Sequence, residues 1–138
     1  MFCSIVKREH KVPMIKETSN FMVFLDVRPV SEGHCLIVPK HHAEKLHELP
    51  RECSSELGPL LVEISRCIGA SDYHVLQTNG TKANQGIPHV HFHIIPKKSE
   101  NEGIEIVLPD VVDYQNLNHQ NLTRVAELIR QKLFQMQF

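Results

Sequence analysis

The chain has 138 residues, 41% of them hydrophobic, which is enough for one domain of ordinary size with its own core. Lysine and arginine number 15 and aspartate and glutamate 16, so the formal net charge is −1. A chain this close to neutral has no overall field to attract nucleic acid or an anionic membrane, and we expect neither as a partner. Any phosphate chemistry must therefore depend on local groups.

The N-terminal segment and the cysteines indicate a reducing compartment. Charged residues from Lys7 to Glu9 stand where a secretory signal would need an apolar core, and no stretch looks long enough to span a bilayer. The four cysteines are widely spaced and form no Cys-x-x-Cys pair, so we expect reduced thiols. We therefore expect a cytoplasmic protein that can also be nuclear.

The first half of the chain predicts three strands followed by a helix. Strands are expected at residues 14–18, 21–27 and 34–40, because runs of apolar residues there are separated by turn residues. A helix is expected between residues 51 and 69, where apolar residues recur at helical spacing. Pro59 lies inside this span, so the helix should either begin late, near residue 55, or kink at the proline.

The second half predicts two more strands and a C-terminal helix. A fourth strand is expected at residues 73–79, and the turn-rich "GTKANQGIP" then leads into a fifth strand that holds three histidines. After a solvated loop, residues 121–135 carry apolar side chains on one helical stripe. Short connections between consecutive strands favour an antiparallel arrangement. We predict an α+β fold with a five-stranded antiparallel sheet, two main helices and the helices on the apolar face.

The fifth predicted strand, "HVHFHIIPK", places His89, His91 and His93 on one face, because side chains alternate along a strand. The intervening apolar side chains face the core. A purely structural role would require three separate hydrogen-bonding partners. Metal binding is a second possibility, although no Asp or Glu follows within residues 94–97. The third is nucleophilic attack on phosphorus by a neutral imidazole, with flanking groups to balance charge.

The sequence around these histidines resembles a known family. "HVHFHII" has the pattern His-φ-His-φ-His-φ-φ, with φ apolar, which is the signature of the histidine triad (HIT) superfamily of nucleotidyl hydrolases and transferases. "FLDVRPVSEGHCLIVPKHH" at 24–42, the "NG…NQGIP" loop and "FCSIVKRE" at 2–9 also match the family's pattern. The resemblance covers residues 1–97 as a core. It implies a single HIT domain over residues 1–138, in which the C-terminal loop and helix at 98–138 are variable.

The resemblance gives the histidines unequal catalytic roles. It makes His91 the nucleophile that attacks the α-phosphorus and forms a transient nucleotidyl-histidine. It places His93 and His34 beside the phosphate and the leaving group, and His89 as support behind them. The alternative for His34 is a polar residue at the start of a strand that has no catalytic role.

The resemblance also implies a set of nucleotide-binding residues. Asp26 would accept hydrogen bonds from both ribose hydroxyls, although a turn-forming Asp at a strand end is the alternative. Gln85 and the amides near Gly86 and Ile87 could donate to the oxygens of the phosphate. Thr78 stands where the family often has Asn, and Asn84 replaces a common Gly. The full expected set is Phe2, Ile5, Phe24, Asp26, Val27, Leu36, Thr78, Asn79, Gln85, Gly86 and Ile87.

Metal binding departs from the family's pattern. Many members bind structural zinc through Cys-x-x-Cys near the start, the His of "PKHH" and the first triad His. Here Cys3 matches the second cysteine and His42 and His89 are present, but the first cysteine would fall before Met1. Three ligands are one short of the tetrahedral set that structural zinc normally needs. We therefore predict no structural zinc, no metal ligand and no required cofactor.

The resemblance implies a hydrolase acting on phosphoramidate or phosphoanhydride bonds of purine nucleotides, with AMP or GMP as product. We expect a nucleoside phosphoramidase first, because the short chain and the triad region resemble that branch most. A dinucleoside polyphosphate hydrolase is the alternative within the family, and a non-catalytic nucleotide-binding or scaffolding protein is the rival from another class. The family also implies a homodimer whose sheets pair through the central helix and a strand.

Overall fold

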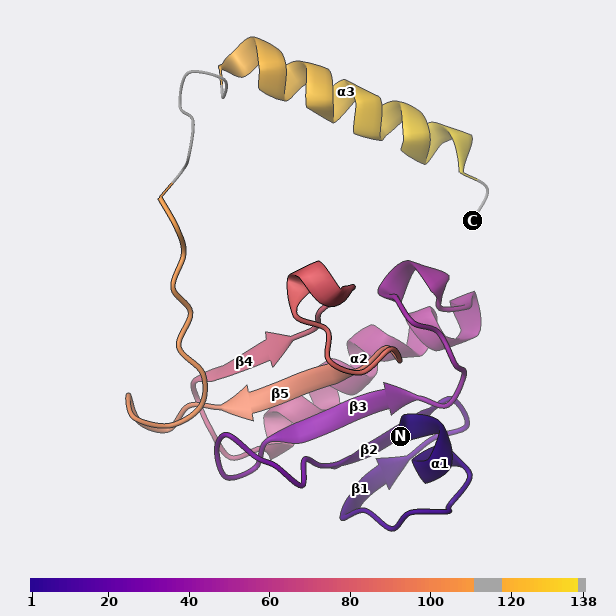
Figure 1. The fold of residues 1–138 in the computed structure, drawn as a ribbon, viewed down its shortest axis with the longest axis vertical. Coiled ribbons are helices and arrows are strands. Elements are labelled where there is room, and N and C mark those ends of the chain that lie inside the picture. Colours follow the sequence, from indigo (N-terminus) through magenta and orange to yellow (C-terminus); the bar gives the residue numbers. More distant parts are fainter. Residues whose placement is uncertain (111–117, 137–138) are drawn as a thin grey trace. The chain divides into compact units, whose positions relative to one another are not determined.

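The computed structural model describes residues 1–110 and 118–136, which fall into two units, Met1–Glu105 and Ile106–Phe138. The first unit contains a five-stranded antiparallel sheet in the order β1-β2-β3-β5-β4 (Figure 1). This confirms the predicted sheet. Its strands are β1 (Met14–Glu17), β2 (Phe21–Leu25), β3 (Cys35–Pro39), β4 (Tyr73–Leu76) and β5 (Phe92–Pro96).

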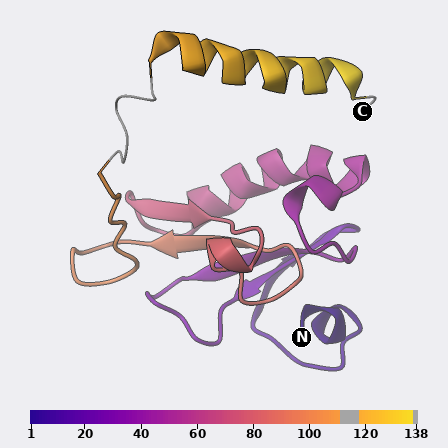
Figure 2. The same ribbon diagram turned by 45° about the horizontal axis from the view of Figure 1, so that its top comes forward.

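The sheet separates two apolar clusters, one on each face (Figure 2). On one face, α2 (Arg51–Cys67) packs Leu60 and Ile64 against alternate residues of the central strands, such as Val23 and Ile37. On the other, the short α1 (Phe2–Val6) contributes to a cluster made of Phe2, Ile5, Met22, Phe24, Leu36 and Val38. Because neighbouring strand residues point to opposite faces, one set of strands builds both clusters.

Helix α2 lies within the span predicted for it, residues 51 to 69. It begins at Arg51, directly after Pro50, and runs through Pro59, so of the two alternatives, a late start near residue 55 or a kink at the proline, the late start is wrong. A proline inside a helix removes one hydrogen bond, and it also crowds the residue before it. That residue is Gly58, which has no Cβ to crowd, and the helix continues through the pair.

The segment that holds the three histidines, residues 89–93, is only partly strand, and it is called the histidine segment below. Strand β5 begins at Phe92 and pairs with β3 from Phe92 onward and with β4 from His93 onward, so it holds His93 but neither His89 nor His91. Before that point the backbone turns to another partner, since the Val90 N–H donates to the Ala43 carbonyl at 2.8 Å. The expected alternation survives, because Val90, Phe92 and Ile94 all lie in the core cluster beneath α2.

The remaining strand boundaries are shorter than predicted. Strand β2 ends at Leu25 instead of residue 27, and β4 ends at Leu76 instead of residue 79. The 3-10 helices η1 (Leu46–Glu48) and η2 (Thr81–Ala83) occupy segments for which no helix was predicted.

The second unit contains α3 (His119–Gln135), which confirms the predicted C-terminal helix. The Asn118 side chain caps it by accepting a hydrogen bond from the Asn121 N–H at 2.9 Å. Its apolar residues are exposed, including Leu122, Val125, Ile129 and Leu133. Across the described part of the chain, no helix has both the length and the apolar character that crossing a bilayer requires.

Candidate active site

A cavity of about 340 Å³ opens between α1, β2, the start of the turn after β2 and the histidine segment. His91 and His93 line it, together with apolar side chains from α1 and the adjacent strands. Most of the expected nucleotide-binding residues line it as well, namely Phe2, Ile5, Phe24, Asp26, Val27, Leu36 and Ile87. The polar groups thus lie at the edge of an apolar slot.

His91 is 7% exposed, and its ring is fixed in orientation by a hydrogen bond to the backbone. Its Nδ1 lies 2.7 Å from the His89 carbonyl oxygen. A carbonyl can only accept, so Nδ1 carries the hydrogen, and in the neutral ring the lone pair is left on Nε2. The Phe2 ring packs edge-on against this imidazole, with centroids 5.0 Å apart. His91 therefore presents a fixed nucleophilic nitrogen beside the cavity.

His93 and His34 form a directed pair. The Val30 N–H donates to His34 Nδ1 at 3.2 Å, so this nitrogen has no hydrogen and His34 Nε2 carries it. That Nε2 lies 2.9 Å from His93 Nδ1, which must accept, so the hydrogen of neutral His93 is on Nε2. Within residues 1–110 and 118–136, this N–H has no hydrogen-bond partner. His93 can therefore donate to a bound anion.

His34 is placed differently from the expectation that it flanks the phosphate. It is 4% exposed and does not line the cavity, because its ring lies behind that of His93. The Asp26 carboxylate lies 3.5 Å from His34 Nε2, close enough to reinforce that proton position. His34 can therefore act on a ligand only through His93.

Burial keeps the rings of His93 and His34 neutral. It lowers the pKa of His93 to about 4, and the neighbouring His91 and His34 lower it further while Asp26 opposes the shift. Burial also lowers the pKa of His34, again against the opposing charge of Asp26. At neutral pH the pair is a chain of uncharged donors and acceptors ending at the cavity.

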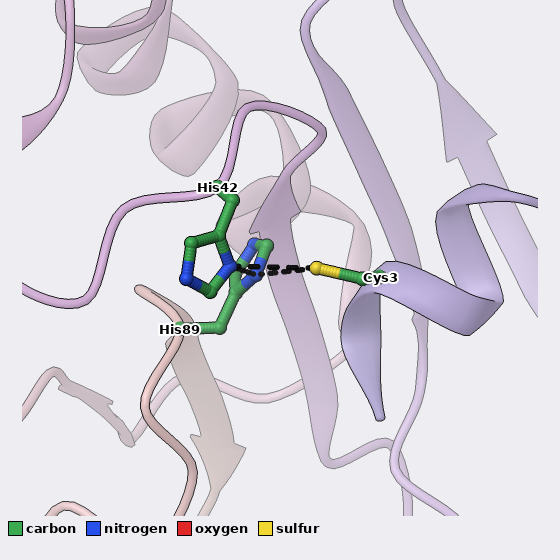
Figure 3. A group of neighbouring side chains, drawn as sticks. All are labelled: Cys3, His42 and His89. Atoms are coloured by element: carbon green, nitrogen blue, oxygen red, sulfur yellow. Dashed lines mark hydrogen bonds between the residues drawn. The ribbon is translucent and has the colours of Figure 1, made fainter.

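His89 does not line the cavity, and its ring lies beside the side chains of Cys3 and His42 (Figure 3). Its Nε2 donates to the Pro39 carbonyl at 2.8 Å, and burial lowers its pKa. Its Nδ1 lies 3.1 Å from His42 Nδ1 and 3.7 Å from Cys3 Sγ, and the third distance, Cys3 Sγ to His42 Nδ1, is 3.4 Å. The three candidate zinc ligands named from the sequence thus converge.

The three converging ligand atoms have the spacing of a zinc site but not its full number of ligands. Tetrahedral coordination at ordinary bond lengths places ligand atoms roughly 3.3 to 3.6 Å apart, close to the spacing of this group. A structural site also needs a fourth protein ligand, and within residues 1–110 and 118–136 this group has three members. The donor set therefore falls short of a closed zinc site.

The loop between β4 and the histidine segment contributes Ile87 to the cavity. Gly80 and Asn84 both adopt positive φ, at 91° and 65°, which tightens the turn around η2. Gln85 and Gly86 line a second cavity of about 340 Å³ rather than the first. The Gln85 amide, which we expected to donate to phosphate, already bonds three backbone groups.

Two of the expected residues line neither cavity. Asn79 is a loop residue whose side chain accepts from the Leu46 N–H at 2.8 Å, and Thr78 precedes it. Conversely, Met1, Val12 and Arg28 line the first cavity although the sequence did not single them out. The sequence offered one signal for Arg28, namely its position two residues after Asp26. In the structure, the Asp26 carboxylate accepts a hydrogen bond from the Arg28 backbone N–H at 2.8 Å.

Comparison with known proteins gives consistent matches. The HIT domain family model matches residues 7–100. Adenosine 5'-monophosphoramidase hnt1 of Schizosaccharomyces pombe is 44% identical, over 79% of this chain and 82% of that protein. A structure of a histidine triad nucleotide-binding protein from Candida albicans is 34% identical with a TM-score of 0.83, covering 96% and 95% of the two chains. A hypothetical protein from Leishmania major is 40% identical with a TM-score of 0.81, covering 94% and 95%.

Proposed function

The chain belongs to the HIT domain family, and from this premise we propose that it hydrolyses nucleoside phosphoramidates, with a purine nucleotide as product. The observation that carries the proposal is the hydrogen bond from His91 Nδ1 to the His89 carbonyl, which leaves Nε2 as the nitrogen that can attack from the wall of the cavity. The fungal relatives named as adenosine 5'-monophosphoramidases support the same reaction.

The reaction proceeds in two displacements at the α-phosphorus. His91 Nε2 attacks first, so that a P–N bond to His91 forms while the P–N bond to the leaving amine breaks. The departing amine takes up one proton. Water then attacks the same phosphorus, the bond to His91 breaks, and the water returns that proton to solvent. One water is consumed for each amine and each nucleoside monophosphate released.

The surrounding groups stabilise the charge that grows on the phosphate oxygens. Neutral His93 donates its Nε2–H to an oxygen, and His34 holds the opposite nitrogen as an acceptor. The backbone carbonyl of His89 fixes the His91 ring by accepting its Nδ1–H, which supports the role of His89 as a residue behind the nucleophile. This division of roles is part of the proposal.

The cavity fits a nucleoside. The apolar slot formed by Phe2, Ile5, Phe24 and Leu36 takes the base, because flat rings pack well against aromatic and branched side chains. Asp26 lies at its edge with carboxylate lone pairs that are not used by the Arg28 N–H, and these accept the ribose hydroxyls. We place AMP or GMP here as the product.

We further propose that the activity requires no metal and no organic cofactor. The nucleophile, the donors to phosphate and the base slot are all supplied by side chains and backbone. Elemental analysis of the purified protein, with turnover measured before and after a chelator, tests this. Stoichiometric metal together with loss of turnover would contradict it.

A homodimer is also part of the proposal. Strand β4 is at the edge of the sheet, where unpaired backbone groups can bond a second copy. Beside it, Tyr73 and Val75 together with Leu61 and Val62 of α2 line a surface hollow of about 330 Å³. Analytical ultracentrifugation at several protein concentrations tests whether the chain is a dimer in solution.

The cysteines support a cytoplasmic or nuclear location for the protein. Cys35 and Cys53 are buried free thiols, and cysteines stay reduced in these compartments.

The deciding experiment measures AMP release from adenosine 5′-phosphoramidate by the wild type and His91→Ala. We expect turnover by the wild type and a loss of at least about 10⁴-fold in the variant, since the covalent route is removed. His47→Ala, at an exposed histidine in η1, is the matched control. A wild type that binds AMP without any turnover would indicate the non-catalytic rival. A preference for dinucleoside polyphosphates over phosphoramidates would indicate the alternative hydrolase.

A further inference from the structure

The side chain of Gln85 has no free hydrogen for a ligand. Its Oε1 accepts from the Gly80 N–H at 2.6 Å, and its Nε2 donates to the carbonyls of Glu44 at 2.7 Å and Ile87 at 3.0 Å. A primary amide carries only two N–H hydrogens, and both are used by these carbonyls. Direct donation to phosphate would therefore break a bond that holds the loop.

The backbone next to Gln85 has what its side chain lacks. Among the residues that the structure describes, the N–H groups of Gly86 and Ile87 have no hydrogen-bond partner. The Ile87 side chain lines the nucleotide cavity. Gly86, which precedes Ile87 in the loop, lines the second cavity. Two adjacent free N–H groups next to a residue of the nucleotide cavity are suited to bind the oxygens of a phosphate.

Gly86 has no internal reason to be glycine. A Cβ built there would meet nothing within 4 Å, and its φ lies outside the range that side chains avoid. Glycine is also used where a ligand must approach the backbone closely. The open space beside Gly86 is therefore consistent with a phosphate that approaches its N–H.

The three bonds of Gln85 set where these N–H groups lie. The bond to Gly80 closes the turn that contains η2, and the bond to Glu44 ties the turn to the segment after β3. The residue before Glu44, Ala43, accepts from the Val90 N–H at 2.8 Å, directly before His91. One short segment thus holds both the loop and the nucleophile.

We propose that Gln85 is a positioning residue that holds the Gly86 and Ile87 N–H groups against the α-phosphate in register with His91. The inference rests on the proposed function, because it concerns the phosphate of that substrate. It predicts an effect on kcat rather than KM, since charge on the phosphate oxygens grows in the transition state.

Two variants test the role by different chemistry. Gln85→Glu keeps an oxygen for the Gly80 N–H but places a second oxygen against two carbonyls. Gln85→Met has similar length and removes all three bonds without adding charge. We expect both to lower kcat by about 10²-fold, the usual effect of a lost oxyanion donor, with KM within about 3-fold of wild type. Gln77→Glu is the matched control, because Gln77 bonds Thr78 and Asn79 in the same loop and not the Gln85 partners.

A spectroscopic readout separates positioning from general loss of structure. In ¹H–¹⁵N spectra of the wild type, the Gly86 and Ile87 amide signals should shift when AMP is added. In both Gln85 variants these shifts should shrink while signals from β2, β3 and α2 stay in place. Unchanged kcat in both variants, or a rise in KM that accounts for the whole loss in kcat/KM, would overturn the role of Gln85. A wild type without turnover would instead reject the proposed function.

Discussion

Single hydrogen bonds decide what each buried histidine can do. His91, His93 and His34 have the same side chain, yet their backbone and ring partners place the hydrogen on Nδ1 in His91 and on Nε2 in His93 and His34. The result is one lone pair and one N–H presented to the same cavity. A nucleophile and a donor are thus made from identical residues by their surroundings.

The position of His34 behind His93 leads to the first prediction. His34→Ala leaves His93 Nδ1 without its donor, so His93 can adopt the other tautomer and lose its N–H toward phosphate. We expect kcat to fall by about 10²-fold. His34→Gln should recover most of the activity, because its amide N–H can reach the position of the lost Nε2–H. Equal losses in both variants would count against control of the tautomer.

The lowered histidine pKa values lead to a second prediction, on stability against pH. Between about pH 6.5 and 4, unfolded His93 binds a proton that the folded ring does not bind, so unfolding is favoured as pH falls. The contribution is fully present above pH 6.5 and is lost progressively toward pH 4. Burial of His34 and His89 acts in the same direction.

Urea unfolding between pH 7.5 and 4 measures this loss. We expect the midpoint of the wild type to fall over that range, and the midpoint of His93→Gln to fall less, because the variant has one fewer buried imidazole to protonate on unfolding. His47→Gln, at an exposed position, should follow the wild type. Parallel curves for the wild type and His93→Gln would refute the assignment.

At the scale of elements, local patterns predicted most of the fold. Apolar runs identified all five strands and both long helices, because burial on a sheet face or helix face imposes a regular spacing. The boundaries at β5 and β4 depended on which backbone groups find partners across the sheet, which the spacing does not contain. Helix α1 is only five residues long, but its buried Phe2 and Ile5 at helical spacing were a usable signal.

The candidate site was predictable in part for the same reason. The apolar slot and Asp26 follow from strand alternation combined with the family resemblance. The pairing of His34 with His93 joins residues 59 positions apart, and that of Gln85 with Glu44 joins residues 41 apart. Contacts of this kind exist only after the sheet is assembled, so the sequence placed these residues near the site without assigning their partners.

The Gly58–Pro59 pair in α2 supports a prediction at the element scale. Pro59 removes a helical hydrogen bond in the middle of a 17-residue helix, and Gly58 is the residue that its ring would otherwise crowd. Pro59→Ala should therefore raise the free energy of unfolding by about 1 to 3 kcal/mol, because the lost bond is restored at an exposed position.

Comparing the single variants with the double variant separates the effect of Gly58 on stability from that of Pro59. A Cβ at Gly58 has nothing within 4 Å apart from its chain neighbours, so Gly58→Ala should add about 0.5 to 1 kcal/mol once Pro59 is alanine. With Pro59 retained, the same change should give no gain, because the new Cβ meets the proline ring. Chemical denaturation of the two single variants and the double variant measures this, and simple additivity would contradict the explanation.

At the scale of the whole molecule, the groups assigned to catalysis and binding all belong to one unit. Both apolar clusters, the cavity and the histidines of the candidate site fall within Met1–Glu105. The second unit contributes α3, whose apolar residues are exposed. The groups assigned to catalysis and binding therefore all precede the C-terminal helix in the chain.

This separation predicts that residues 1–105 alone fold and keep the site. We expect the truncated chain to release AMP from adenosine 5′-phosphoramidate with kcat/KM within about 3-fold of the full chain, because no cavity residue is removed. A full-length variant with Leu122→Ser and Ile129→Ser keeps α3 but interrupts its apolar row, so it separates the effect of losing the helix from that of losing its exposed apolar surface. If the truncated chain folds, as judged by circular dichroism, but no longer binds AMP, then the second unit completes the site. In that case the serine variant shows whether the apolar row of α3 is the part that does so.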